Sequence, residues 1–211
     1  MSFTPSDFRT TMARFATGVT VVTTTLDHTY FGLTVNAFCS VSLNPPLILV
    51  SLDLGSQTYA SIRRSGVFAV NMLAQEQEPL ALRFARKDLS SKTFDDIAIR
   101  AGEATGVPLF AEALACIECR VAHEYPGGDH ALMLGEVVNV ACSSDRLANE
   151  PLLYYRSAFW VNPQELAASK LPTPSGKPAS GQREERNGAE VPARLPAIEL
   201  VPLPFVFSFE V

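Results

Sequence analysis

Apolar and β-branched residues occur in short runs along this chain, and Gly, Pro, Asn and Asp separate one run from the next. Runs of this length and composition predict β-strands. They cover residues 19–25, 31–35, 47–52, 67–73, 114–124 and 131–142. The turn residues 126–129 between the last two predict a hairpin. Because the strands do not alternate with helices and no internal repeat occurs, we predict an all-β fold, a β-barrel with peripheral helices.

Helical signals appear in three places. Near the N-terminus, Thr4 is suited to cap a helix and Pro5 to occupy its first position. The apolar residues that follow have helical spacing, which predicts a helix laid on the core: Phe8, Met12 and Phe15. Gly18 is expected to end that helix. A second helix is predicted between Ser56 and Gly66, and a third over residues 75–87, whereas residues 89–110 are expected to be irregular.

The stretch 32–52 is the one around which we expect the fold to be organised. It predicts an extended run, a polar bend over residues 36–42, a stop at Pro45-Pro46 and an apolar strand. Asn36, Ser40 and Ser42 bring an amide, two hydroxyls and backbone N–H groups to this bend, which suits a phosphate or the edge of a pyrimidine-like ring. A polar loop that satisfies only its own turns is the alternative.

Composition bounds the class of protein. The chain has 211 residues, of which 47% are hydrophobic and 18% charged, enough for one good core. A net charge of −5 argues against nucleic-acid or anionic-membrane surfaces, so we expect small molecules or proteins as partners. Residues 1–14 do not resemble a signal peptide, and no apolar run reaches the length of a membrane span. We therefore expect a cytoplasmic protein.

The composition changes after residue 162, which divides the chain into a domain over 1–162 and a tail over 163–211. Eight of the fifteen prolines lie in this tail, and we expect it to be disordered. Near its end Phe205, Phe207 and Phe209 alternate, which would suit addition to a sheet edge.

The four cysteines are expected to be reduced. Cys116 and Cys119 have the spacing of a metal or redox motif, but on a strand residues three apart point to opposite faces. We therefore expect no metal site. The chain also lacks the G-x-G-x-x-G, Walker, H-E-x-x-H and G-x-S-x-G motifs. A protein whose chemistry belongs to a bound cofactor needs none of these motifs.

The segment T-V-N-A-F-C-S-V-S-L-N-P-P-L-I-L-V-S-L, residues 34–52, resembles the signature of the flavin reductase-like family. Further similar blocks are G-V-T-V-V-T at 18–23, S-G-V-F-A-V-N at 65–71, G-G-D-H at 127–130 and G-E-V at 135–137, so the resemblance runs from about Phe8 to Trp160. It implies an FMN-binding split barrel with Greek-key topology. It also implies reduction of FMN or FAD by NADH or NADPH, a homodimer, and a partner monooxygenase that receives the reduced flavin.

The resemblance also implies site residues. His130, in G-D-H, is expected to lie near the nicotinamide as the catalytic residue. At the end of the third helix, the resemblance implies contacts with the flavin phosphate and ribityl chain from Phe84, Ala85, Arg86 and Lys87. The other cofactor-binding residues are expected from their polar groups and backbone N–H groups, in the bend, in the next strand and at the start of the second helix: Thr34, Val35, Asn36, Ala37, Phe38, Ser40, Ser42, Ser51, Leu52, Ser56 and Thr58. A non-catalytic FMN-binding protein and a split-barrel FMN oxidase for a small substrate are the alternatives.

Overall fold

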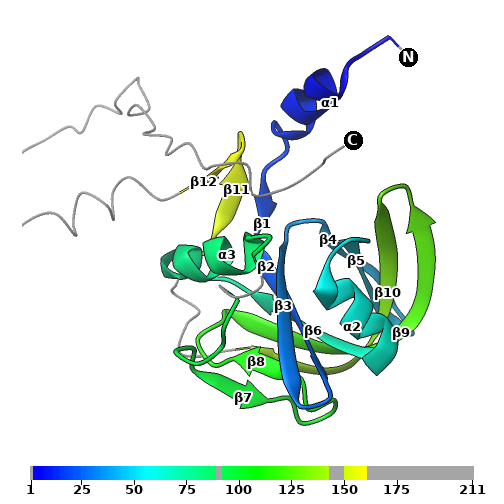
Figure 1. Cartoon of the computed structure of the whole chain (residues 1–211), viewed down its shortest axis with the longest axis vertical. Coiled ribbons are helices and arrows are strands. Elements are labelled where there is room, and N and C mark those ends of the chain that lie inside the picture. The colour runs from blue at the N-terminus through cyan, green and yellow to red at the C-terminus, as the bar shows by residue number, and fades with distance from the viewer. Residues whose placement is uncertain (1, 89–91, 143–149, 161–211) are drawn as a thin grey trace, which may run out of the picture.

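The computed structural model describes residues 2–88, 92–142 and 150–160, and these residues fold mainly into β-strands (Figure 1). The helical elements are α1 (Pro5–Met12), α2 (Gln57–Ser65), α3 (Glu78–Ala85) and the short 3-10 helix η1 (Gln75–Gln77). The strands are β1 (Thr17–Gly18), β2 (Thr20–Leu26), β3 (Thr29–Val35), β4 (Phe38–Leu43), β5 (Pro46–Asp53), β6 (Val67–Met72), β7 (Ile99–Ala101), β8 (Pro108–Phe110), β9 (Ala115–Gly127), β10 (His130–Cys142), β11 (Leu153–Tyr155) and β12 (Ala158–Trp160). The predicted all-β class is confirmed.

Seven strands form one antiparallel sheet in the order β3-β2-β6-β9-β10-β5-β4. The two edge strands, β3 and β4, follow each other in the chain with only Asn36 and Ala37 between them. Since two residues cannot span an open sheet of this width, the sheet curls until its edges meet. Strands β6, β9, β10 and β5 are neighbours in that order, so β5 returns beside β10 in a Greek-key arrangement.

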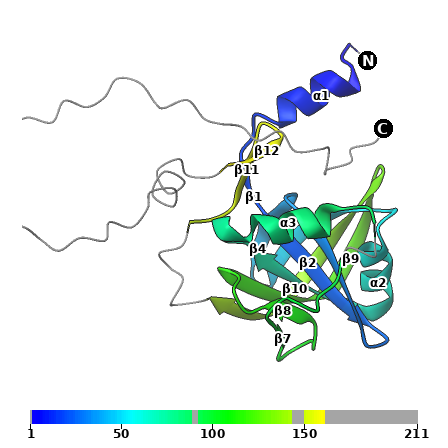
Figure 2. The same ribbon diagram turned by 60° about the vertical axis from the view of Figure 1, so that its left-hand side comes forward.

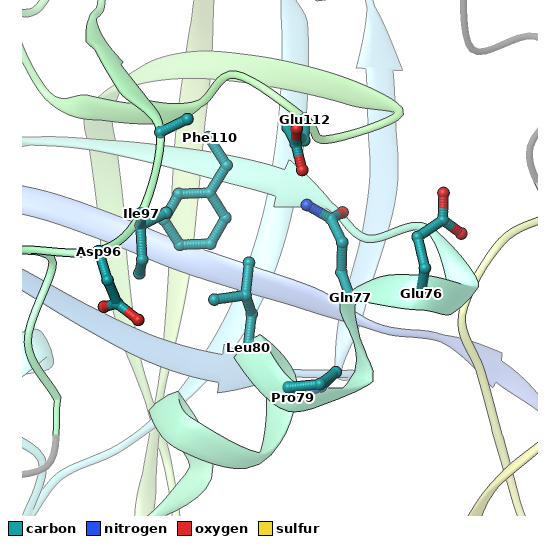
Figure 3. A pocket seen from close by; sticks show the side chains of 9 residues that line it. Glu76, Gln77, Pro79, Leu80, Asp96, Ile97, Phe110 and Glu112 are labelled. Carbon is teal, nitrogen blue, oxygen red and sulfur yellow. The ribbon is translucent and has the colours of Figure 1, made fainter.

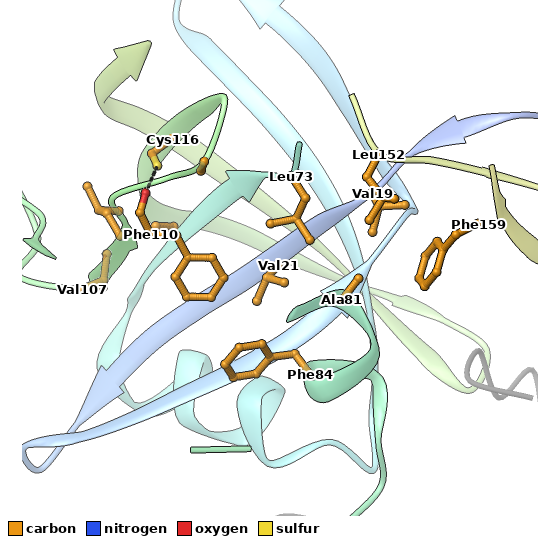
Figure 4. Packing of buried hydrophobic residues seen from close by; sticks show 13 residues of the cluster. Val19, Val21, Leu73, Ala81, Phe84, Val107, Phe110, Cys116, Leu152 and Phe159 are labelled. Carbon is orange, nitrogen blue, oxygen red and sulfur yellow. Dashed lines mark hydrogen bonds between the residues drawn. The ribbon is translucent and has the colours of Figure 1, made fainter. Parts of the chain in front are cut away.

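The central strands of this sheet are buried on both faces. Val22, Phe68 and Cys119 point into one apolar cluster, which also contains Tyr59 and Ile62 of α2. Their neighbours on the opposite face belong to a second cluster with α3 and β8, shown in Figure 4: Val21, Ala69, Phe84, Phe110 and Cys116. Cys116 and Cys119 therefore lie on opposite faces of β9, as predicted. The described residues contain no group of three or more His, Cys, Asp or Glu that could hold a metal ion.

Helix α1 begins as predicted but does not lie on the core. Thr4 and Asp7 form a capping box, in which the Thr4 Oγ1 accepts from the Asp7 N–H and the Asp7 carboxylate accepts from the Thr4 N–H. The helix ends at Met12, and the apolar side chains of this segment stay exposed, with Phe8 at 45% and Phe15 at 69%. Figures 1 and 2 both show α1 projecting away from the barrel. The spacing predicted the helix correctly, but the prediction that its chain's own core covers it was wrong.

The predicted bend over residues 36–42 was also wrong in extent. Only Asn36 and Ala37 lie outside strands, because β4 begins at Phe38 and pairs with β5 from Phe38↔Val50 to Leu43↔Pro46. Backbone pairing with a strongly apolar strand outweighs the polar composition of the Ser40 and Ser42 region. The turn before β5 contains a cis peptide bond between Asn44 and Pro45.

The predicted ends of the second helix are confirmed. Ser56 caps α2, and Gly66 ends it in the left-handed conformation with φ 72°. The region expected to be irregular contains the short strands β7 and β8. The proposed tail over 163–211, including its last phenylalanines, lies outside the described residues.

None of the helices in the described ranges has the length and apolar character that crossing a membrane requires.

One buried charge organises the loop before β8. Glu118 on β9 is 1% exposed. Its Oε2 accepts from the N–H of Ala104, the N–H of Thr105 and the Thr105 hydroxyl, and its Oε1 accepts from Asn139 Nδ2. Burial by itself raises the pKa of this carboxyl, but the hydrogen bonds outweigh burial and lower it below its usual value. Stability from Glu118 is therefore present above the unfolded pKa and is lost as the pH falls.

We predict that Glu118→Gln destabilises the domain by about 1–3 kcal/mol at pH 7, because an amide cannot accept all four hydrogen bonds. Urea unfolding measures this difference. Since the folded-state pKa is lowered, the gap to wild type should shrink as the pH falls below about 4.3, the unfolded value. Glu136→Gln, at an exposed position of β10, is the control and should change stability by less than about 0.5 kcal/mol. A loss independent of pH would contradict the assignment.

Candidate functional site

A cleft of about 990 Å³ lies between α1, β1 and the edge of the barrel. Its walls are largely apolar, with Phe8, Met12 and Phe15 on one side and Phe38 and Leu49 on the other. The polar groups that reach it include Thr17, Thr20 and Asn36. A volume of this order, apolar walls and a few polar groups are typical of sites for small organic ligands and cofactors.

The floor of the cleft is the two-residue link between β3 and β4. Ala37 is held there because its carbonyl accepts from the Ser51 N–H at 3.0 Å, across from β5. The amide of Asn36 donates to the Thr17 hydroxyl at 3.3 Å, which ties the link to β1. Nothing lies within 4 Å of the position that a Cβ on Gly18 would take, so the cleft stays open at β1.

The sheet register brings the hairpin of β9 and β10 to the same end of the barrel. Ser51, beside Ala37, pairs with Leu132, and Asp53 pairs with His130 two residues further along β5, a displacement of about 7 Å. The Leu54 N–H donates to the Asp129 carbonyl at 3.1 Å, which fixes the hairpin tip beside the residues that lead into α2.

His130 is oriented by its neighbour in the chain. The side chain is 16% exposed, and its Nδ1 lies 2.7 Å from Oδ1 of Asp129. That hydrogen bond lowers the pKa of Asp129, so the carboxylate remains charged beside the imidazole. The register thus places His130 at the same end of the sheet as the Ala37 link, with β5 between β10 and the link, although His130 is not among the residues that line the cleft.

Several predicted binding residues reach this end of the barrel only through their backbone. Thr34, Val35, Leu52 and Thr58 have buried side chains. The Thr34 hydroxyl donates to the Ala81 carbonyl at 2.7 Å, so it is used inside the fold. The Ser56 Oγ accepts from the Tyr59 N–H as the α2 cap. A hydroxyl or a side chain committed in this way does not present itself to a ligand.

Two other predicted groups lie away from the cleft. Ser40 and Ser42 continue along β4 toward the Asn44 turn, whereas Cys39, which was not predicted, lines the cleft. Its contribution could not be foreseen while residues 36–42 were treated as a loop. Thr17, Gly18 and Tyr154 were also missed, because Thr17 pairs with Tyr154 across more than a hundred residues and no local pattern marks that contact.

The segment from Phe84 to Lys87 is not brought to the cleft of the same chain. Helix α3 runs antiparallel to β3, since Ala81 lies beside Thr34 and the buried Phe84 ring covers Gly32. Ala85, Arg86 and Lys87 therefore lie toward the start of β3, at the end opposite Asn36. The prediction grouped them with the cradle from their chemistry, but the direction of α3 separates them.

A second pocket of about 210 Å³ lies beside the start of α3 (Figure 3). Acidic side chains surround it, namely Glu76, Asp96 and Glu112, and Arg83 is paired with Asp96. Carboxylates disfavour a phosphate-bearing cofactor. The pocket contains none of the predicted binding residues, so the cleft at the Ala37 link is the candidate site.

The cleft fits a planar heteroaromatic cofactor. Apolar walls suit the faces of such a ring, and backbone and amide groups at the link suit its polar edge. Residues 12–161 match the model of the flavin reductase like domain. The chain belongs to this flavin reductase-like family. The resemblance predicted from the sequence is thereby confirmed.

Curated relatives and solved structures agree with the family. The chain is 36% identical to an NADH-dependent flavin reductase of a Rhodococcus species, over 74% of this chain and 85% of that protein. It is 38% identical to the FMN reductase (NADH) SmoA of Agrobacterium fabrum, over 72% and 83% of the two chains. The NADH:FAD oxidoreductase SgcE6 of Streptomyces globisporus superposes with a TM-score of 0.68 at 35% identity, covering 75% of this chain and 95% of that one. The predicted split-barrel fold is confirmed by these neighbours.

Thiol reactivity tests where a flavin binds in this family member. Burial raises the pKa of Cys116 to about 11 and that of Cys119 to about 12, whereas Cys39 and Cys142 are exposed. We therefore predict that a thiol reagent at pH 8 modifies Cys39 and Cys142 in the folded protein, and Cys116 and Cys119 only after unfolding.

Because Cys39 lines the cleft, FMN at ten times its Kd should slow its modification about ten-fold. Cys142, at the far end of β10, is the internal control and should react at an unchanged rate. Peptide mapping by mass spectrometry separates the two thiols. Equal protection of both cysteines, or no protection of Cys39 at a saturating concentration, would place the flavin elsewhere.

Proposed function

We propose that this protein is an NADH-dependent flavin reductase that supplies reduced FMN or FAD to a separate monooxygenase. The observation that carries the proposal is the apolar cleft at Asn36 and Ala37, which lies at the same end of the sheet as the hairpin that bears His130. Family membership and the activities named for the relatives support it, including the reductase subunit HsaB of a flavin-dependent monooxygenase in Rhodococcus jostii. The SgcE6 structure with NAD and FAD fragments supports both cofactors.

The chemistry of the reaction belongs to the cofactors, since a bound flavin accepts a hydride from the nicotinamide of NADH. The protein supplies position and polarity. The Ala37 link and the apolar walls of the cleft would hold the isoalloxazine ring, because they combine backbone groups with side chains suited to stacking. An open cleft also suits exchange of flavin with a second protein, since reduced flavin must leave the site.

His130 would act on the nicotinamide side of the site. Asp129 holds its imidazole through Nδ1, which fixes the plane and direction of the ring. Leu54 holds the Asp129 backbone, so the hairpin tip and the end of β5 move as one unit. A fixed imidazole at this place can orient a dinucleotide or assist the proton movement that accompanies reduction.

An anaerobic assay tests the proposed activity. Purified protein with NADH and excess FMN should bleach the flavin absorbance over many turnovers. Stoichiometric bleaching, or none, would overturn the proposal in favour of a flavin-binding protein without reductase activity. A flavin that remains bound through gel filtration and is reduced by a small organic substrate instead of NADH would favour an oxidase.

His130→Ala should lower kcat/KM for NADH by at least about ten-fold and leave the Kd for FMN within about two-fold, because the residue orients the nicotinamide and not the flavin. Steady-state kinetics and flavin fluorescence measure the two quantities. His123→Ala is the matched control: His123 lies on the same hairpin, is exposed, and contacts the Tyr125 ring. Equal effects of the two substitutions would remove His130 from the mechanism.

We also propose that the functional unit is a homodimer. The first helix segment exposes Phe3, Phe8, Met12 and Phe15, each by at least 45% of its surface. The same helix forms a wall of the cleft, and the other described residues of the chain leave its apolar side chains exposed. Exposed apolar surface of this kind marks an interface, and a second copy would cover α1.

The double substitution Phe8→Ser and Phe15→Ser should therefore convert the protein from a dimer to a monomer. Light scattering after gel filtration should show a mass near 22.9 kDa in place of twice that value. Val140→Ser removes another exposed apolar side chain, on β10, and is the control that should remain dimeric. A wild-type protein that elutes as a monomer at micromolar concentration would refute the proposal.

A further inference from the structure

Tyr59 connects helix α2 to the hairpin that bears His130. Its side chain is mostly buried between α2 and β9. The phenolic hydroxyl donates to Oε1 of Glu124 at 2.7 Å, and Nε of Arg63 lies 3.0 Å from the other oxygen, Oε2. The Arg63 guanidinium also lies 5.7 Å from the centre of the Tyr59 ring. One carboxylate on the hairpin is thus held by two side chains of α2.

The backbone of Tyr59 also takes part in the N-terminal cap of α2. Its N–H donates to the Ser56 hydroxyl at 3.1 Å and so completes the cap at the start of α2. The residues just before Ser56 are the ones that meet the hairpin tip, through the bond from the Leu54 N–H to the Asp129 carbonyl. Tyr59 therefore contacts both the segment that leads from β5 into α2 and the flank of the hairpin.

In the hairpin, β10 is held by its pairing with β5 from His130↔Asp53 to Glu136↔Leu47, whereas the outer part of β9 depends on other attachments. Pairing of β9 with β6 ends at Arg120↔Val67, so beyond that point β6 no longer supports β9. A register shift between Leu134 and Gly135 redirects the hairpin, and residues 123–129 are exposed. On the β9 side, α2 takes over from β6, through the bond from the Val121 N–H to the Gly66 carbonyl at 2.9 Å and through the contact of Tyr59 with Glu124.

We propose that Tyr59 is a positioning residue, which holds the hairpin at Glu124 and thereby sets the place of His130 relative to the flavin cleft. The proposal rests on the reductase function given above. Tyr59 acts through Glu124, which lies three residues before Gly127, the partner of His130 across the hairpin. The hydrogen bond to Glu124 also raises the pKa of Tyr59, so the hydroxyl remains a donor at neutral pH.

Tyr59→Phe isolates the hydroxyl because the ring remains. It should raise KM for NADH about three- to ten-fold, the size expected for loss of one hydrogen bond, and leave the Kd for FMN within about two-fold. Glu124→Gln keeps an acceptor for the hydroxyl and should stay closer to wild type than Glu124→Ala. The alanine also removes the Arg63 contact, so Glu124→Ala should raise KM at least as much as Tyr59→Phe does. Arg64→Ala, on the same helix as Tyr59, is the control without effect, because it breaks only an exposed ion pair with Asp27 in the turn between β2 and β3.

Hydrogen exchange provides a readout that does not depend on activity. Amides of residues 124–130 should exchange about three- to ten-fold faster in Tyr59→Phe than in wild type, while the interior strand β6 should be unchanged. The double variant Tyr59→Phe with Glu124→Ala should be no worse than Glu124→Ala alone, because Glu124→Ala already removes the partner of the Tyr59 hydroxyl.

The outcomes distinguish two claims, that Tyr59 holds the hairpin and that this attachment positions His130. Unchanged exchange in the hairpin overturns the attachment itself. Faster exchange with unchanged KM, or a lower melting temperature as the sole effect, overturns the positioning role and leaves Tyr59 as a packing residue. If wild-type protein fails to oxidise NADH, the proposed function fails, and the positioning role fails with it, whereas hydrogen exchange still decides whether Tyr59 holds the hairpin.

Discussion

The constraint on which this structure depends is the two-residue connection between the edge strands β3 and β4. A connection this short makes the first and last strands of the sheet meet, and the sheet must curl into a barrel to permit it. The same residues, Asn36 and Ala37, then lie where the barrel closes and are fixed by bonds to β1 and β5. The two residues that close the barrel therefore also line the candidate cleft, so closure of the fold determines where the cleft lies.

Burial on both faces of the central strands gives this closure its support. β2, β6 and β9 place alternate side chains in the barrel interior and in the cluster under α3 and β8. Asn71 is buried between them, and its amide donates to the Val21 carbonyl and accepts from the Phe110 N–H. A polar side chain with its partners satisfied fixes how the layers align, which apolar packing alone does weakly. The strands that carry His130 and Ser51 are extensions of this framework.

Much of this fold could be predicted from local sequence because the relevant signals are local. The α2 helix follows from a Ser56 cap and a Gly66 terminator, and the hairpin from turn residues between two long apolar runs. The failures share one cause, which is a contact between distant residues. The polar segment after Phe38 becomes a strand because β5 pairs with it, and Arg86 is led away from the cleft by the direction of α3 over β3.

Helix α1 shows most clearly what a single chain's pattern cannot determine. The spacing of Phe8, Met12 and Phe15 predicts an apolar face, but it does not determine whether the same chain or another molecule packs against that face. In the folded chain that face stays exposed and forms a wall of the cleft, so the shape of the binding site depends on whatever packs against α1. If a second copy covers α1, as proposed, then assembly completes a wall of the cleft, and binding in the cleft is coupled to assembly. The hairpin side differs, since Tyr59, Leu54 and their partners fix His130 within one chain. If flavin binds in the cleft and nicotinamide beside His130, as proposed, the nicotinamide side is held by internal contacts and the flavin side is open. That arrangement suits a reductase that releases its reduced flavin.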